Sequence, residues 1–350
     1  MTPRFAFVVH ALSPAHRRVM GLRWATMRLA LGMDEGVSPW KMGRICDLGL
    51  PGIADGVILG ITLDPEQMLA DQERAVLRME RVVRLALEEG PLAAVGLGSL
   101  CAVVGGRGEA LAERLPVPVT TGGAATAWAL AVNTLRVVEA LGTAGPVAVV
   151  GASSPVGRAV AAYLADAGLG VRVDGKRAGK GLAVEVCEGP EEAVAGAPVV
   201  VGAGPTGGVL APEALAPGAV LVDVALPATL TGPPPPGVQV LAGEAIALPP
   251  NWARGGWGHA YHLFAGYGPT QVFACVIEPL VLAATGRGAP YALGRKLELS
   301  AVRDFGRAAE ALGFVPRLAE GGRGIEPSRV AQPRPASGLR GLVSARLQRR

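Results

Sequence analysis

A strand, a turn of small residues and a helix follow one another around residue 151, and this succession constrains the fold more than any other feature. An apolar segment at 146–150 leads into the turn G-A-S-S-P-V-G at 151–157, and apolar residues at helical spacing follow at 158–167. The start of a helix offers unpaired N–H groups and a positive dipole end, and small residues let a phosphate approach the backbone. The segment therefore predicts a nucleotide-binding βαβ unit. An ordinary tight turn between a strand and a helix is the alternative.

Length and composition predict a globular enzyme with two domains. The chain has 350 residues, of which 50% are hydrophobic and 18% charged, a profile that excludes a disordered protein. The net charge is +4, but residues 320–350 hold seven arginines and two glutamates, so the rest of the chain is close to neutral. A nucleic-acid-binding surface over the whole protein is therefore not expected. Residues 319–350 are expected to form a flexible basic tail, either solvated or in contact with RNA, anionic lipid or a protein partner.

Cysteine and histidine usage argues against a metal site. None of the four cysteines forms a C-x-x-C pair, and only four histidines are present. The chain starts without a secretory signal pattern and contains no apolar run of about 20 residues. We therefore expect no transmembrane segment, a cytoplasmic location and reduced thiols.

Strand patterns alternate with helix patterns along most of the chain. A helix is expected from Asp64-Pro65-Glu66 to about Glu89, because an acidic N-cap and a proline at the first position are typical of a helix start. Its apolar face would contain Leu69, Val76, Met79, Val83 and Ala86. Expected strands lie at 5–9, 57–61, 93–97, 117–121, 170–173, 182–186, 199–201, 220–224 and 238–241. The alternation predicts an α/β fold with a doubly wound parallel sheet packed against a second α/β domain.

Seven short segments, taken in order and spacing, resemble one known family over residues 5–318. They are V-V-H-A-L-S-P-A-H at 8–16, V-G-L-G-S-L-C-A-V-V at 95–104, V-T-T-G at 119–122, V-A-V-V-G-A-S at 147–153, L-V-D-V-A-L-P at 221–227, Q-V-F-A-C-V-I-E at 271–278 and G-F-V-P at 313–316. The chain resembles the cyanobacterial-type long-chain acyl-[acyl-carrier-protein] reductases, which form fatty aldehydes from acyl thioesters with NADPH. The resemblance implies an N-terminal substrate domain at 1–121 completed by helices at 269–318, and a Rossmann-like NADP-binding domain at 122–268.

The resemblance also implies a reaction at Cys275. In the family this cysteine takes the acyl group from acyl carrier protein or acyl-CoA, and hydride from NADPH then releases an aldehyde. Exchange of one thioester for another is nearly thermoneutral, which suits a cysteine nucleophile. From the residues alone, a buried structural cysteine is the alternative. The sequence departs from the family at Gly123, Ala124 and Ala125, where Asn, a small residue and His are usual.

Cofactor contacts are expected from three places along the chain. The glycine turn would supply Gly151, Ala152, Ser153, Ser154, Val156 and Gly157. Lys176 and Arg177 would pair with the 2′-phosphate of NADPH, whereas Asp174 favours the ribose hydroxyls of NADH, which is therefore not excluded. Ala203 and Gly204 would contribute from the end of a later strand.

Two further residues are candidates for catalysis. His10 ends the first strand and would act as a general acid, with a structural histidine as the alternative. Asp223 would orient the substrate or cap neighbouring backbone. His259 and His262 lie in an aromatic, glycine-rich stretch that would form a lid or an acyl entrance.

The sequence therefore predicts NADPH-dependent reduction of a long-chain acyl thioester to an aldehyde in lipid metabolism. Two alternatives stay open: a dehydrogenase of the shikimate or amino-acid type that acts directly on a carbonyl, and a non-catalytic NADP-binding regulator. A homo-oligomer is compatible with each of these three functions.

Overall fold

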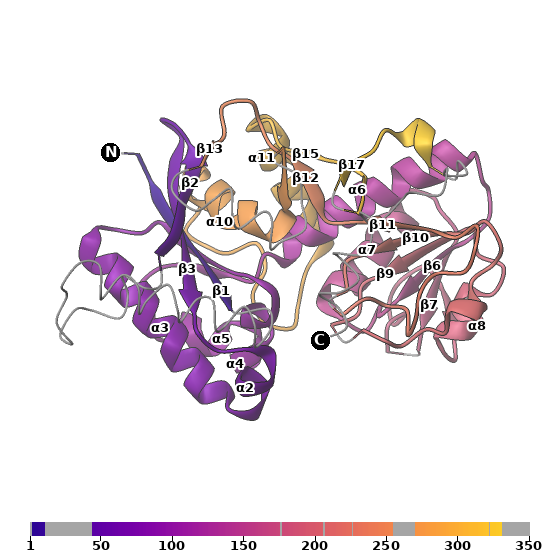
Figure 1. The fold of residues 1–350 in the computed structure, drawn as a ribbon, viewed down its shortest axis with the longest axis horizontal. Helices are drawn as coiled ribbons and strands as arrows, with labels where there is room; N and C mark the ends of the chain where they lie inside the picture. Colours follow the sequence, from indigo (N-terminus) through magenta and orange to yellow (C-terminus); the bar gives the residue numbers. More distant parts are fainter. Residues whose placement is uncertain are drawn as a thin grey trace. The chain divides into compact units, whose positions relative to one another are not determined.

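The computed structural model describes residues 2–10, 44–175, 177–205, 207–225, 227–254, 270–321 and 323–330. The chain divides into two compact units. Unit 1 comprises Met1–Gly123, Pro249–Tyr261 and Cys275–Lys296, and unit 2 comprises Ala124–Leu248, His262–Ala274 and Leu297–Arg350 (Figure 1). Strands alternate with helices in both units, which confirms the predicted α/β class. The helices expected at 269–318 to complete the N-terminal domain are divided between the units, because residues 275–296 group with unit 1 and residues 297–318 group with unit 2.

Unit 1 is built on a six-stranded sheet with the order β13-β2-β3-β1-β4-β5. Neighbours among β3, β1, β4 and β5 pair in parallel, while β2 and β13 add an antiparallel edge. The strands are β1 Arg4–His10, β2 Arg44–Leu50, β3 Ala54–Ile61, β4 Ala94–Leu97, β5 Val119–Thr120 and β13 Ala253–Arg254. Parallel strands are buried on both faces, which explains the nearly continuous apolar run of β1.

The helices of unit 1 are α2 Pro65–Ala70, α3 Gln72–Glu89, η2 Ser99–Ala102, α4 Val104–Arg107, α5 Glu109–Ala112 and α10 Ala274–Thr285. The predicted start at Asp64 is confirmed: its side chain accepts a bond from the Gln67 N–H, and the Gln67 side chain accepts from the Asp64 N–H. The single helix expected to run to Glu89 is instead two helices. Asp71 interrupts it with non-helical backbone, and its carboxylate caps α3 by accepting from Arg74 N at 2.9 Å.

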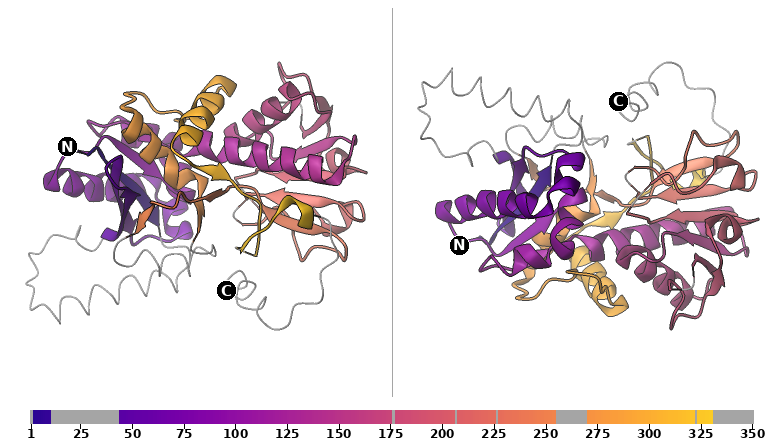
Figure 2. Two further views of the ribbon diagram at one scale, coloured as in Figure 1. Left: turned by 90° about the horizontal axis from the view of Figure 1, so that it is seen from above. Right: turned by 90° about the horizontal axis from the view of Figure 1, so that it is seen from below.

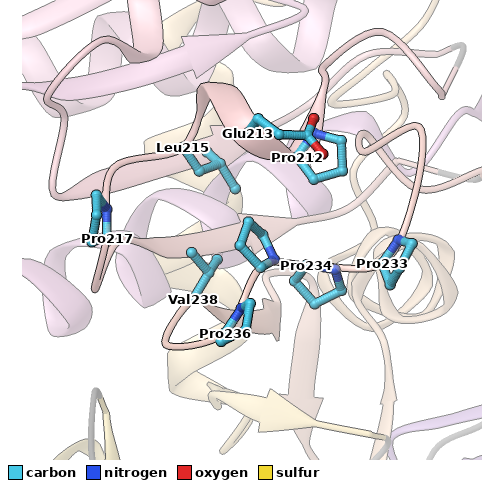
Figure 3. Close-up of a pocket in the computed structure, with 9 residues that line it drawn as sticks. Pro212, Glu213, Leu215, Pro217, Pro233, Pro234, Pro236 and Val238 are labelled. Atoms are coloured by element: carbon cyan, nitrogen blue, oxygen red, sulfur yellow. The ribbon is translucent and has the colours of Figure 1, made fainter.

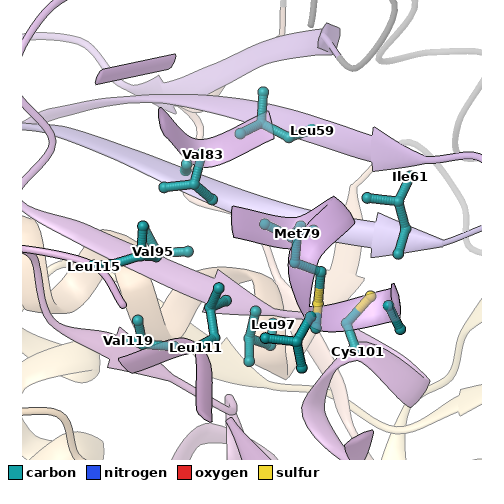
Figure 4. Packing of buried hydrophobic residues seen from close by; sticks show 14 of the residues in the cluster. Leu59, Ile61, Met79, Val83, Val95, Leu97, Cys101, Leu111, Leu115 and Val119 are labelled. Carbon is teal, nitrogen blue, oxygen red and sulfur yellow. The ribbon is translucent and has the colours of Figure 1, made fainter. Parts of the chain in front are cut away.

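This interruption changes which residues face the core. In α3, five residues are buried, namely Ala75, Val76, Met79, Val83 and Ala86. Leu69, expected on the same face, lies in α2 and is 57% exposed, because the break at Asp71 resets the helical phase. Figure 4 shows Met79 packed with Leu97 and Cys101 in the core of unit 1.

Unit 2 contains an eight-stranded sheet with the order β17-β16-β11-β10-β9-β6-β7-β8. The strands are β6 Val147–Val150, β7 Val171–Asp174, β8 Glu185–Cys187, β9 Val199–Gly202, β10 Val220–Asp223, β11 Gln239–Ala242, β16 Ala319–Glu320 and β17 Arg323–Gly324. β6 to β11 pair in parallel, and their spatial order is third, second, first, fourth, fifth, sixth. In this doubly wound order the connections diverge between β6 and β9, where ligands bind in such sheets.

The remaining elements of unit 2 cover this sheet or extend it. The helices are α6 Gly123–Leu141, α7 Pro155–Asp166, α8 Pro190–Val194, η3 Pro212–Ala214, α11 Leu299–Ala311 and η4 Pro327–Arg329. Figure 2 shows α6 running along the sheet, and Trp128 of α6 packs edge to face on Phe305 of α11 with ring centroids 5.7 Å apart. A small sheet with the order β14-β12-β15 is formed by Gln271–Phe273, Ala245–Ala247 and Val315–Pro316. In the described part of the chain, no helix combines the length and the apolar character needed to cross a bilayer.

Replacing Met79 tests the assignment of the core of unit 1. Met79 is 0% exposed, so Met79→Ala removes buried methylene and thioether groups and leaves a cavity. We expect the free energy of unfolding to fall by about 2–5 kcal/mol, measured by denaturant titration. Leu77→Ala is the matched control on the same helix, because Leu77 is 48% exposed, and a change within about 0.5 kcal/mol is expected. Equal losses for the two variants would contradict the assignment.

Candidate functional site

The turn after β6 lies directly against the turn after β9 in unit 2. Gly151 has a φ of +84°, and a Cβ atom there would lie 2.3 Å from the Gly204 nitrogen, so only glycine fits. Ser154 caps α7 by accepting from Gly157 N at 2.9 Å, and its hydroxyl donates to Ala203 O at 2.9 Å. The structure therefore brings together these five predicted residues at the carboxyl ends of β6 and β9.

Asp174, at the end of β7, occupies the backbone donors of this turn. Its two carboxylate oxygens accept bonds from Gly151 N and Ala152 N, each at 2.9 Å. A phosphate bound to these two N–H groups would have to displace a carboxylate of like charge. The expected phosphate cradle is therefore filled by the protein's own acidic side chain.

The other residues predicted to contact the cofactor do not take part in the contact between the two turns. Ser153 is exposed, and Val156 is half-buried in the first turn of α7. Arg177 is exposed, and its carbonyl oxygen accepts from the Arg158 side chain at 3.4 Å. Lys176 lies outside the described residues, as do His259 and His262.

Asp223 ends β10, and its oxygens bond to the turn that follows it. Oδ1 accepts from Ala225 N at 3.0 Å and from Thr229 Oγ1 at 2.8 Å, and Oδ2 accepts from Thr229 N at 2.9 Å. Burial raises the pKa of Asp223, although these hydrogen bonds act in the opposite direction. This geometry favours the backbone-capping alternative over substrate orientation.

In unit 1, the segment after β5 packs along the first turn of α10. Gly122 has a φ of +73°, and a Cβ atom there would lie 2.4 Å from the Cβ of Cys275. Glu278, one turn further along α10, is hydrogen-bonded to the Thr120 hydroxyl, and both side chains are 0% exposed. Thr120 Oγ1 also lies 3.0 Å from the Ala292 carbonyl oxygen. These contacts fix the start of α10 and the position of Cys275.

Cys275 differs from the other described cysteines in its surroundings. It is half-buried and is the second residue of α10. Cys101 and Cys187 are buried, and burial raises the pKa of both thiols. Of Cys101, Cys187 and Cys275, whose side-chain burial the structure describes, Cys275 is therefore the thiol best placed to react.

His10 lies at the carboxyl end of β1 and is 3% exposed. Its Nε2 accepts a bond from Leu100 N at 3.2 Å, which places the ring proton on Nδ1. The imidazole therefore holds the turn into η2, which favours the structural alternative over a general acid.

Sequence reasoning missed the buried pair Thr120 and Glu278. The available signal was a single acidic residue inside the apolar run at 272–284, since a buried charge needs a polar partner. Among the described residues, no group of three or more His, Cys, Asp or Glu side chains is arranged to hold a metal ion.

An open groove of about 390 Å³ lies elsewhere on unit 2 (Figure 3). It is lined by Pro212, Glu213, Leu215, Pro217, Val238 and the proline run 233–236. These segments lead into the amino ends of β10 and β11. Ligands of doubly wound sheets bind at the carboxyl ends, so the groove is separate from the candidate site.

Comparison with known proteins gives a relative that matches most of the chain. The chain is 30% identical to the aminotransferase PigE of Serratia sp. (strain ATCC 39006) over 93% of its own length, and it spans 41% of that protein. No protein-family model matches the chain. A 5,10-methylenetetrahydrofolate dehydrogenase from the silkworm Bombyx mori aligns over 89% of this chain and 88% of its own, with a TM-score of 0.30 and 12% identity. Both proteins are enzymes by name.

The Serratia relative overturns the family expected from the sequence. A protein named an aminotransferase matches almost the whole chain, so the recognition of an acyl-[acyl-carrier-protein] reductase is wrong. The prediction of thioester reduction to a fatty aldehyde is wrong with it, as are the two alternatives, a carbonyl dehydrogenase and an NADP-binding regulator. Amino transfer exchanges an amino group for a carbonyl group and consumes no hydride. The expectation that NADPH, or NADH in its place, is the cofactor is therefore wrong too. Acyl carrier protein and acyl-CoA are unsupported as partners.

Alkylation by iodoacetamide tests the assignment of the reactive thiol. We expect Cys275 to be carbamidomethylated before Cys101 and Cys187 in the folded protein, because it is more accessible. Peptide mass spectrometry over a time course gives the order of modification. Faster labelling of Cys101 would contradict the structure, and labelling in denaturant, where all thiols are exposed, is the control.

The pH dependence of stability tests the buried state of Asp223. Its pKa is raised from the usual 3.8, so ionisation is penalised in the folded state. The stability of the native protein relative to Asp223→Asn should therefore be greatest below pH 3.8 and decrease as the pH rises through the raised pKa. Denaturant titrations of both proteins across this range provide the measurement. A relative stability that increases with pH would show that hydrogen bonding outweighs burial.

Proposed function

We propose that this chain takes part in amino-group transfer between an amine and a carbonyl compound. The observation that carries the proposal is the 30% identity to an aminotransferase over 93% of the chain. Because the chain spans 41% of that relative, the proposal concerns participation in the reaction and not every step of it.

Aminotransferases use pyridoxal phosphate, which a lysine amine holds through an imine and whose ring serves as an electron sink. The chain has four lysines. Lys180 and Lys296 are exposed, and Lys41 and Lys176 lie outside the described residues. The backbone donors of the turn after β6 are bonded to Asp174 and not open to a phosphate. The described residues therefore do not fit pyridoxal phosphate, and no step is assigned through it.

Unit 2 is proposed as a Rossmann-like ligand-binding domain. The order of its parallel strands and the glycine turn at the divergence between β6 and β9 support this assignment. The proposal concerns the fold and the position of the ligand, and it assigns no nicotinamide cofactor.

Unit 1 is proposed to bind the carbonyl compound at the start of α10. Cys275 is the candidate nucleophile there, and a thiol adds reversibly to a carbonyl carbon. In this step an S–C bond forms, the carbonyl π bond breaks and the thiol proton passes to the oxygen. The reverse step returns the carbonyl compound unchanged. Thr120, Gly122 and Glu278 are positioning residues, because they fix the helix turn that carries Cys275.

A chimera with the Serratia aminotransferase tests the proposed function. This chain replaces the region of the relative that it matches, and amine formation is measured with an amino-acid donor and a panel of aldehydes and 2-oxo acids. We expect amine formation in the chimera and a decrease of at least about tenfold for Cys275→Ser, equal to about 1.4 kcal/mol of lost transition-state stabilisation. Cys187→Ser is the matched control and should retain activity, because this buried cysteine is not assigned to the site. A folded chimera that binds pyridoxal phosphate and forms no amine would refute the proposal.

A further inference from the structure

We infer that the pyridoxal phosphate of this reaction is held by a polypeptide region outside residues 1–350, and that this chain acts beside that region without binding the cofactor itself. The inference rests on the proposed function, and it deepens that proposal by naming the chemistry of the partner region.

The first support is the occupation of backbone donors in the turn between β6 and α7 of unit 2. Phosphate sites at such positions use backbone N–H groups that point outward to the ligand. Here the N–H groups of Gly151 and Ala152 are both bonded to Asp174, and the N–H of Gly157 is bonded to Ser154. The turn is therefore completed by a carboxylate and a hydroxyl of the protein, and a phosphate would face a negative charge in place of free donors.

The second support is the placement of the lysines. An amine that forms an imine must lose its proton, which burial in an apolar pocket promotes. Both described lysines are exposed, Lys180 beyond β7 and Lys296 between α10 and α11. Glu278 and Thr120, the buried polar pair near Cys275, supply no amine. None of the candidate sites in the described residues therefore combines a buried lysine with a phosphate cradle.

The third support is the extent of the similarity. The chain spans 41% of the Serratia aminotransferase, so more than half of that protein lies outside the match. A region with the missing lysine and phosphate contacts has room in the unmatched part. The partner region is therefore a pyridoxal-phosphate-binding polypeptide, which is either joined to residues 1–350 or carried by a separate chain.

Reductive trapping decides whether this chain holds the cofactor. The full chain is incubated with pyridoxal phosphate, reduced with borohydride and digested, and the pyridoxyl group is located by mass spectrometry on Lys41, Lys176, Lys180 and Lys296. We expect no stoichiometric labelling of any one lysine, while the full-length Serratia aminotransferase, treated in parallel, is labelled. Stoichiometric labelling of one lysine, lost when that lysine is replaced by arginine, would overturn the inference.

Asp174→Ala tests the occupied donors with inorganic phosphate as the probe. Removing the carboxylate frees the N–H groups of Gly151 and Ala152 and removes a like charge. Calorimetry should show phosphate binding at least about tenfold tighter to the variant than to the native chain. Binding of equal strength to both proteins would contradict the role given to Asp174.

The two levels of the proposal fail in different ways. A labelled chain whose chimera forms amine overturns the inference and leaves amino transfer in place. An unlabelled chain whose folded, cofactor-bound chimera forms no amine overturns amino transfer, and the inference with it. An unlabelled chain whose chimera forms amine, and whose Cys275→Ser variant forms it at least about tenfold more slowly, supports both.

Discussion

The contact between two backbone turns, after β6 and after β9, organises the carboxyl edge of the sheet in unit 2. Gly151 approaches the Gly204 backbone so closely that no Cβ atom fits between them. Parallel pairing of β6 with β9 aligns the strand ends and brings the turns to one edge. Ser154 then joins the two turns by donating to Ala203. Asp174 accepts hydrogen bonds from Gly151 N and Ala152 N, so these two donors of the turn are satisfied within the protein.

In unit 1, the close backbone contact is made by a helix, α10, and not by a second turn. α10 lies close to β4, where Pro279 packs on Gly96, and close to the end of β5, where Cys275 packs on Gly122. Glu278 is buried in this contact and is hydrogen-bonded to Thr120. Small residues on the sheet side thus admit the helix, and the buried polar pair sets its register along the strands.

Local patterns predicted the elements well, because β6 is apolar throughout, β1 is apolar between Arg4 and His10, and Asp64 has a capping sequence. They failed at Asp71, where a second cap divides the helix and turns Leu69 to solvent. Asp174 and Glu278 show a different limit. Their partners, Gly151 and Thr120, are 23 and 158 residues away in the chain, so no local pattern identifies the pairs. The resemblance to reductases matched short segments, whereas the relative found by comparison matches nearly the whole chain.

The contact between Gly122 and Cys275 makes the two positions interdependent. The left-handed backbone and the missing Cβ at 122 leave room for one side chain on α10, and that room is filled by the cysteine. Any enlargement on one side must be absorbed by the other or by tilting the helix, which Pro279 and Glu278 resist. The constraint on position 122 does not depend on the sulfur, because the atoms nearest to a Cβ there would be the Cβ, Cα and carbonyl oxygen of residue 275, and the φ of +73° itself favours glycine.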